Sequence, residues 1–226
     1  MQKPSATIVT GAIAVTVALS IFGVLQWRAS TATIAAGFWY EDFPFTLPAE
    51  HTARLGGSLS AAEIESIKRL SRVQLEQAFS QLRIVINDRR DAFWRIRVLE
   101  NLNPPGPTSG IGTGRLRVPR SGEAYALGPL GGAGSVSFVV AALGAIHYAP
   151  PGASREDMIR GIGHGIGRAA AHELGHAVLG GRLVHNDEDE SSYEFSSWDR
   201  VGQYYGELRW TTARPLLEQR FGRKGP

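Results

Sequence analysis

Residues 169–181 read AAAHELGHAVLGG, and the interpretation of the whole chain starts from this stretch. Its alanine-rich composition favours a helix, and the paired glycines Gly180 and Gly181 are typical of a helix C-terminus. His172 and His176 are four residues apart, so a helix places both imidazoles on one face, one turn apart. Glu173 directly follows the first histidine. The stretch therefore predicts a helix that brings two imidazoles and a carboxylate together.

Two imidazoles with this spacing are able to bind one zinc ion. Glu173 is then placed to act as general base toward a zinc-bound water, whose pKa the metal lowers toward ~7. The alternative is that His172 and His176 are ordinary residues of the helix. In a buried helix that alternative leaves unpaired polar groups, which are costly. We therefore expect a Zn²⁺ site with His172 and His176 as ligands and Glu173 as the catalytic residue.

The segment 171–181 resembles the active-site helix of the zincin metallopeptidases, and 165–195 resembles their metzincin branch in its matrixin-like form. The resemblance implies a zincin-like fold, a peptide substrate and a third histidine ligand after the helix, which here is His185. Two features depart from that family. Its usual third histidine falls on Arg182, three residues before His185. Its turn methionine is also missing, since Tyr193 lies near that position and the chain has only two methionines, Met1 and Met158.

The third ligand has two other candidates. Glu194 lies eighteen residues after His176, which resembles the glutamate-liganded zincins, and Asp187 lies close to His185. Tyr193 is either a hydrogen-bond donor to a developing oxyanion or an aromatic residue packed beneath the metal. A closed site with both His185 and Glu194 as ligands leaves no position for water. It would indicate a non-catalytic binding module with a structural zinc.

The amino terminus predicts a membrane segment. Residues 4–27 carry no charged side chain, and a helix over 6–27 would be about 33 Å long, enough for the ~30 Å hydrocarbon layer. A retained single-pass anchor is favoured over a cleaved signal because the run exceeds a usual signal core. Lys3 before the span favours a cytoplasmic amino terminus, which places the domain on the periplasmic or extracellular side of a lipid membrane.

The rest of the chain predicts an α+β domain over 58–226, preceded by an anchor or signal segment (1–28) and a linker or approach segment (29–57). Ser60 and Glu63 form a capping box for a long amphipathic helix that covers a small sheet. A second helix runs from Ser154 to Gly180. We expect strands at 83–87, 93–99, 123–127 and within 136–148, a turn at 131–134, a long loop at 101–122, and a helical region at 198–221 interrupted near Pro215.

Composition excludes several classes of function. The chain has no cysteine, so disulfides, thiolate metal sites and cysteine nucleophiles are absent. The net charge is only +3 and the basic residues are not clustered, which argues against a nucleic-acid partner. The sequence GIGHGIG at 161–167 lacks the setting of a phosphate-binding loop, and close helix packing explains its glycines better.

Overall fold

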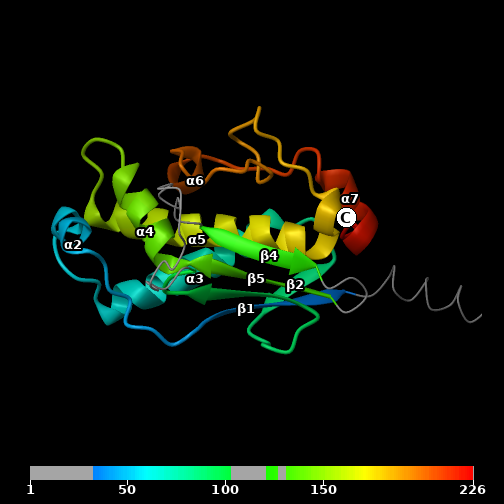
Figure 1. The fold of residues 1–226 in the computed structure, drawn as a ribbon, viewed down its shortest axis with the longest axis horizontal. Coiled ribbons are helices and arrows are strands. Elements are labelled where there is room, and N and C mark those ends of the chain that lie inside the picture. The colour runs from blue at the N-terminus through cyan, green and yellow to red at the C-terminus, as the bar shows by residue number, and fades with distance from the viewer. Residues whose placement is uncertain (1–32, 103–120, 127–130, 226) are drawn as a thin grey trace, which may run out of the picture.

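The computed structural model describes residues 33–102, 121–126 and 131–225. Their strands form one five-stranded mixed sheet in the order β2-β1-β3-β5-β4 (Figure 1). β1 is parallel to β2 and β3, β3 is parallel to β5, and β4 runs antiparallel to β5 at the sheet edge. The bounds are β1 (Ile34–Tyr40), β2 (Ile84–Asn87), β3 (Trp94–Leu99), β4 (Gly122–Ala126) and β5 (Gly132–Ser137).

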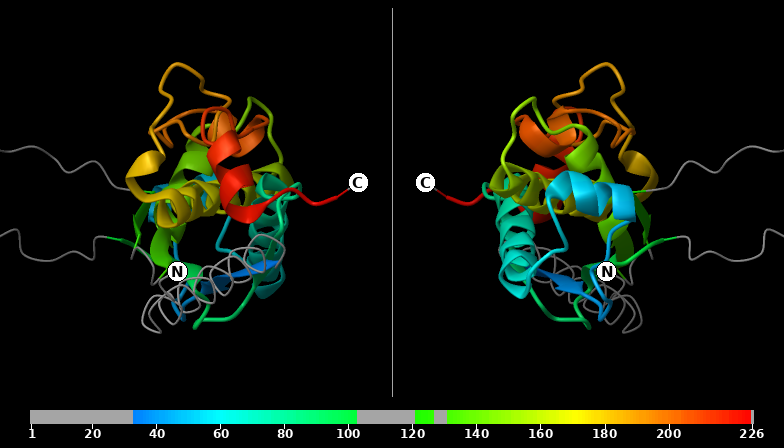
Figure 2. Two further views of the ribbon diagram at one scale, coloured as in Figure 1. Left: turned by 90° about the vertical axis from the view of Figure 1, so that its right-hand side faces the viewer. Right: turned by 90° about the vertical axis from the view of Figure 1, so that its left-hand side faces the viewer.

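Two long helices cover one face of this sheet. α3 (Ala61–Ala78) and α5 (Arg155–Leu179) pack against each other, and α5 also lies along β3, β4 and β5 (Figure 2). The buried side of β3 alternates along the strand as Trp94, Ile96 and Val98, which is the period expected for a half-buried strand. The capping box at Ser60 is present, so the predicted start of the first long helix is confirmed.

The glycines of α5 permit this close packing. A Cβ at Gly163 would meet Leu70 of α3 at 2.6 Å, and one at Gly167 would meet the backbone oxygen of Ser71 at 2.4 Å. The helix ends at Leu179 because Gly180 adopts a φ of 58°, which glycine reaches without strain. The predicted helix from Ser154 to Gly180 thus matches α5, which carries the motif histidines.

The approach segment contributes to the sheet itself. Residues 34–40 form β1, which lies between β2 and β3, and Ala36 and Phe38 are fully buried on its inner side. The sequence did not reveal this strand because it contains the small residues Ala35, Ala36 and Gly37. These lack the β-branched side chains by which strands are recognised in a sequence. α2 (Ala49–Leu55) follows β1, so the segment predicted as a linker or approach segment contains regular structure.

The apolar run 136–148 is mostly a helix rather than a strand. β5 ends at Ser137, whose hydroxyl accepts from the backbone N–H of Val140 and so caps α4 (Phe138–His147). The predicted turn at 131–134 is instead the start of β5. Gly132 is needed there because a Cβ would lie 2.2 Å from the backbone oxygen of Ala177 on α5. A short apolar run alone does not distinguish a buried strand from a buried helix.

The carboxyl-terminal part returns over α5. A short 3-10 helix, η2 (Gly180–Arg182), is followed by a long loop, and Figure 1 shows this segment arching above α5. Two short helices follow in place of the predicted interrupted one, α6 (Gly202–Tyr205) and α7 (Arg214–Phe221). Pro215 lies in the first turn of α7, where its missing N–H costs no hydrogen bond. Most of the predicted 101–122 loop lies outside the described residues.

The predicted fold is corrected in one respect, its membrane-spanning helix, which is not among the described elements. Within the ranges that the structure describes, no helix is both long and apolar enough to cross a bilayer. The longest helix in these ranges, α5, carries charged residues such as Arg155, Glu156 and Arg168 along its length. Residues 1–28, which led to that prediction, lie outside the described part of the chain. The expected lipid partner and the expected periplasmic or extracellular location depend on the same segment.

Candidate metal centre

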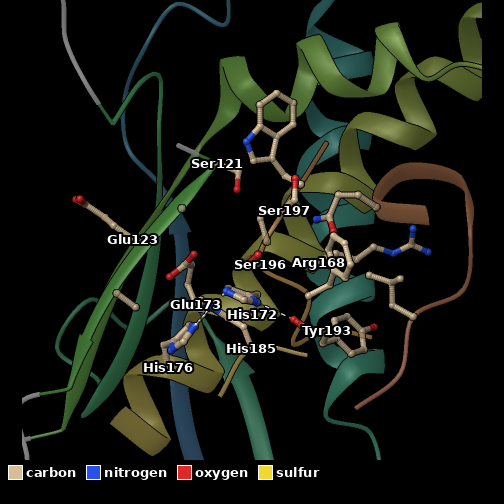
Figure 3. Close-up of a pocket in the computed structure, with 17 residues that line it drawn as sticks. Ser121, Glu123, Arg168, His172, Glu173, His176, His185, Tyr193, Ser196 and Ser197 are labelled. Carbon is tan, nitrogen blue, oxygen red and sulfur yellow. Dashed lines mark hydrogen bonds between the residues drawn. The ribbon is translucent and has the colours of Figure 1, made fainter. Parts of the chain in front are cut away.

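α5 positions three of the predicted site residues. His172, Glu173 and His176 lie in its last two turns, where the helix crosses β4 and β5. The i and i+4 spacing places the two histidines on one face, as the sequence predicted. The rings of His172 and His176 have centroids 4.7 Å apart (Figure 3). The rigid helix therefore holds two potential ligands at a fixed separation.

His185 reaches the same place through the chain reversal after α5. The buried side chain of Leu183 anchors this reversal against Gly175, where a Cβ would lie 2.7 Å from the Leu183 Cδ1 atom. Gly175 thus lets the returning loop approach the helix between the two motif histidines. The ring of His185 stacks on His172, with centroids 5.3 Å apart and planes 15° from parallel.

Three imidazole nitrogens converge. The Nε2 atom of His176 lies 3.1 Å from Nε2 of His172 and 3.0 Å from Nε2 of His185. The potential ligand atoms of the three residues all lie within 4.8 Å of one another, so this group could hold a metal ion. Two nitrogens about 2.0–2.1 Å from one tetrahedral ion would be about 3.3–3.4 Å apart, close to the observed separations. The donor set therefore fits a metal ion.

A backbone carbonyl fixes the orientation of His172. Its Nδ1 donates a 2.6 Å hydrogen bond to the carbonyl oxygen of Tyr193, which is able only to accept. The proton of a neutral His172 is therefore on Nδ1, and Nε2 presents its lone pair to His176 and His185. Support of this kind is usual for metal-binding histidines. Sequence reasoning missed it, because a backbone carbonyl carries no side-chain signature.

Burial keeps the helix imidazoles neutral. It lowers the pKa of His172 to about 4, and it lowers the pKa of His176 to about 4 with smaller contributions from the two other histidines. The hydrogen bond to Tyr193 acts in the opposite direction on His172 but is the smaller effect. Neutral imidazole is the form that binds metals, so both residues are ready to act as ligands at neutral pH.

Glu173 is a buried carboxyl beside the histidines. Its side chain lies against β4, where Gly122 leaves the space: a Cβ there would be 2.3 Å from Oε1 of Glu173. Burial raises the pKa of Glu173 to about 8, and the charge of Glu123 adds to the rise. A cation held by the histidines would act in the opposite direction. Because burial raises the pKa of this carboxyl and a bound cation would lower it, the carboxyl is suited to accepting and returning a proton near neutral pH.

The two rival ligands are engaged elsewhere. The fully buried carboxylate of Glu194 accepts hydrogen bonds from the backbone N–H groups of Thr211 (2.9 Å) and Ala213 (2.7 Å) and from the hydroxyl of Ser192. Asp187 accepts a 2.8 Å hydrogen bond from the backbone N–H of Ser196, and its pKa is lowered mainly by hydrogen bonding to the side chain of Ser196 and then by this backbone bond. Neither residue belongs to the potential metal-binding group.

The side chain of Tyr193 is packed. Its ring lies against Trp210, with centroids 5.0 Å apart, and its hydroxyl accepts a 3.2 Å hydrogen bond from Gln74 of α3. Of the two roles predicted for Tyr193, that of a packed aromatic residue therefore fits its side chain. Its backbone carbonyl makes a separate contact with His172.

The histidines and Glu173 line a cavity of about 570 Å³. One wall consists of Ser121 and the first residues of β4, and the opposite wall is the loop that contains Tyr193 and Phe195. In Figure 3, Glu173 lies on one side of His172, toward β4, while Arg168 and Tyr193 lie on the other. The potential ligands thus face a space large enough for a segment of a substrate.

No family model matches the chain, and no curated protein matches it.

Proposed function

We propose that this protein is a zinc-dependent peptidase of zincin type. The observation that carries the proposal is the convergence of three imidazole nitrogens, on His172, His176 and His185, beside a buried carboxyl in a cavity. Three histidine ligands with an open fourth position are the arrangement of catalytic zinc sites, whereas structural sites are closed by four protein ligands. Among the described residues no fourth His, Cys, Asp or Glu joins the group.

When bound, a zinc ion supplies positive charge that lowers the pKa of water and polarises a substrate carbonyl. Glu173 removes a proton from the attacking water and returns it to the leaving amine. Its packing against Gly122 holds the carboxyl in place at the cavity that the histidines line. The Tyr193 carbonyl keeps His172 in the tautomer that leaves Nε2 free to act as a ligand.

β4 supports a peptide as the substrate. It is one of the two edge strands of the sheet that the described residues form, and Gly122, Glu123 and Ala124 line the cavity. An edge strand offers unpaired backbone N–H and C=O groups, which an extended peptide can pair with as an added strand. A peptide bound in this way would run past Glu173 and the histidines.

A non-catalytic module with a structural zinc is the second candidate from the sequence. It requires a closed site with both His185 and Glu194 as ligands. The buried hydrogen bonds of Glu194 and the absence of a fourth ligand side chain among the described residues favour the peptidase instead.

The test compares Glu173→Gln with Glu156→Gln. Glu156 is an exposed residue in the first turn of the same helix, so it is a matched control for the loss of one α5 carboxylate. Zinc content is measured by mass spectrometry, and cleavage is measured on an unselected peptide library. We expect both variants to bind zinc, and Glu173→Gln alone to lose cleavage by at least about a hundredfold. Full cleavage by Glu173→Gln would refute the assigned mechanism.

A further inference from the structure

Arg168 is a buried cation next to the candidate metal centre. It lies on α5, four residues before His172 and on the same face, and only 5% of its surface is exposed. It lines the cavity that contains the histidines and also a second cavity of about 360 Å³. Tyr193 and Leu208 line both cavities as well, so these three side chains separate them.

The guanidinium of Arg168 has only part of its hydrogen bonds satisfied. Nη1 donates to the carbonyl oxygen of Gly202 (2.8 Å) and Nη2 to that of Gly206 (2.6 Å), while the buried Nε has no partner among the described residues. Within the described parts of the chain, no ion pair includes Arg168. Burying a cation without an anion is costly, and burial accordingly lowers the pKa of Arg168.

The second cavity is rich in hydrogen-bond donors. Its lining includes the amides of Gln74, Gln77 and Gln81, and Glu207 is the only carboxylate among the described residues that line it. Arg209 and Arg214 also contribute, although each already pairs with an acid outside the lining. A cavity of this chemistry accommodates an anionic group better than an apolar one.

We propose that Arg168 binds a carboxylate of the peptide substrate, on the side of His172 opposite Glu173. The inference rests on the proposed peptidase function and adds a substrate class: peptides that carry a carboxylate close to the scissile bond. The planar guanidinium fork matches a carboxylate, and the second N–H groups of Nη1 and Nη2, which do not bind Gly202 and Gly206, would supply the hydrogen bonds. The carboxylate belongs either to an acidic side chain or to the free carboxyl terminus of the peptide.

Arg200 provides a matched control. It is also buried, its Nη1 and Nη2 donate to the carbonyl oxygens of Glu190 and Ser192, and its Nε also lacks a partner in the part of the chain that the structure describes. It lines neither of the two cavities. A variant at Arg200 thus removes a buried arginine that braces backbone carbonyls, without removing a cation from the substrate site.

The experiment measures binding in a protein that does not cleave. Glu173→Gln is combined with Arg168→Gln, Arg168→Lys or Arg200→Gln, and each zinc-loaded full-length protein is titrated against fluorescent decapeptide pools by anisotropy. The pools are amidated and random, except that one position, scanned along the peptide, is fixed as Glu or Gln. A third pool carries Gln and a free carboxyl terminus. Circular dichroism checks the fold of every variant.

With Arg168 intact, we expect one Glu position, or the free carboxyl terminus, to tighten binding by about tenfold to a hundredfold over the amidated Gln pool. Arg168→Gln should abolish this preference, Arg168→Lys should retain part of it, and Arg200→Gln should leave it unchanged. The pool that gains affinity identifies the source of the carboxylate. Equal binding of all pools by the Glu173→Gln protein, or equal loss in the Arg168→Gln and Arg200→Gln proteins, would overturn the inference.

Cleavage of the same pools by the wild-type protein separates the two claims. If the pools are bound with the carboxylate preference but none is cleaved, the peptidase proposal fails and the carboxylate site stands. If they are cleaved without any such preference, the carboxylate site fails and the peptidase proposal stands.

Discussion

The carbonyl oxygen of Tyr193 accepts a 2.6 Å hydrogen bond from Nδ1 of His172, and this contact joins the returning loop to the helix that carries the motif. Through this contact the backbone of Tyr193 supports the candidate metal centre without a sulfur atom. The backbone of Tyr193 orients the ligand, and its ring and hydroxyl pack against Trp210 and Gln74.

Tyr193→Phe should therefore change stability more than activity. The substitution keeps the carbonyl and the ring but leaves the amide of Gln74 without its partner, so we expect a loss of about 1–2 kcal/mol in the free energy of unfolding. Urea denaturation measures the free energy of unfolding, and kcat on a cleaved peptide measures activity. A fall in kcat of about a hundredfold or more would instead assign the hydroxyl to oxyanion stabilisation.

Gly122→Ala should impair catalysis and spare metal binding. The added Cβ would lie 2.3 Å from Oε1 of Glu173 and 2.6 Å from its Cγ, so the carboxyl has to move away from its place. We expect kcat to fall by about tenfold or more while zinc content stays at the wild-type level. Gly181→Ala is the control, because a Cβ there meets nothing within 4 Å. Unchanged kcat in Gly122→Ala would show that the position of Glu173 is unimportant.

Glu194→Gln should destabilise the fold without removing the metal. The carboxylate accepts from two backbone N–H groups and the Ser192 hydroxyl in a fully buried place. The substitution replaces one carboxylate oxygen by an NH2 group, which places a hydrogen-bond donor opposite groups that are themselves donors. The cost to stability is about 1–3 kcal/mol. Thermal unfolding and zinc analysis of the folded variant test both parts. A folded Glu194→Gln protein that cannot hold zinc would make Glu194 a ligand after all.

The ion pair between Glu63 and Arg155 should make stability depend on pH in the acid range. The hydrogen bonds from Arg155 are the largest cause that lowers the pKa of Glu63 from 4.5 to about 2. A depressed pKa contributes stability that is fully present above pH 4.5 and is lost as the pH falls toward 2. Because both side chains are partly exposed, the contribution is on the order of 1 kcal/mol.

Glu63→Gln tests this assignment. Urea denaturation at pH 7 should show the variant less stable than wild type, and the difference should shrink between pH 4.5 and pH 2. A difference that stays constant over this range would exclude the ion pair as its source.

Local chemistry made the two long helices, α3 and α5, predictable. The capping box at Ser60, the Ser154 start and the Gly180 end each fix a helix boundary through contacts within a few residues. Once the helix is recognised, the i, i+4 spacing of His172 and His176 predicts that they lie on one face. Strands β2 and β3 were visible in the sequence because their burial alternates with period two.

The remaining features depend on contacts between distant residues. β1 and β5 contain small residues, and Gly132 is small because α5 passes over it, which no local pattern reveals. The choice among His185, Glu194 and Asp187 depended on how the loop after α5 folds back. Nothing in the sequence near Glu194 indicates that Thr211 and Ala213 supply its hydrogen bonds.

Metal stoichiometry is the most direct test of the central claim. The protein is purified without chelator and dialysed against trace zinc, and bound metal is counted by mass spectrometry for wild type, His185→Ala and His51→Ala. His51 lies on α2 outside the potential metal-binding group, so it controls for the loss of one histidine. We predict about one zinc per chain for wild type and His51→Ala, and a clear loss for His185→Ala. A wild-type protein without bound metal, or an unaffected His185→Ala variant, would contradict the account.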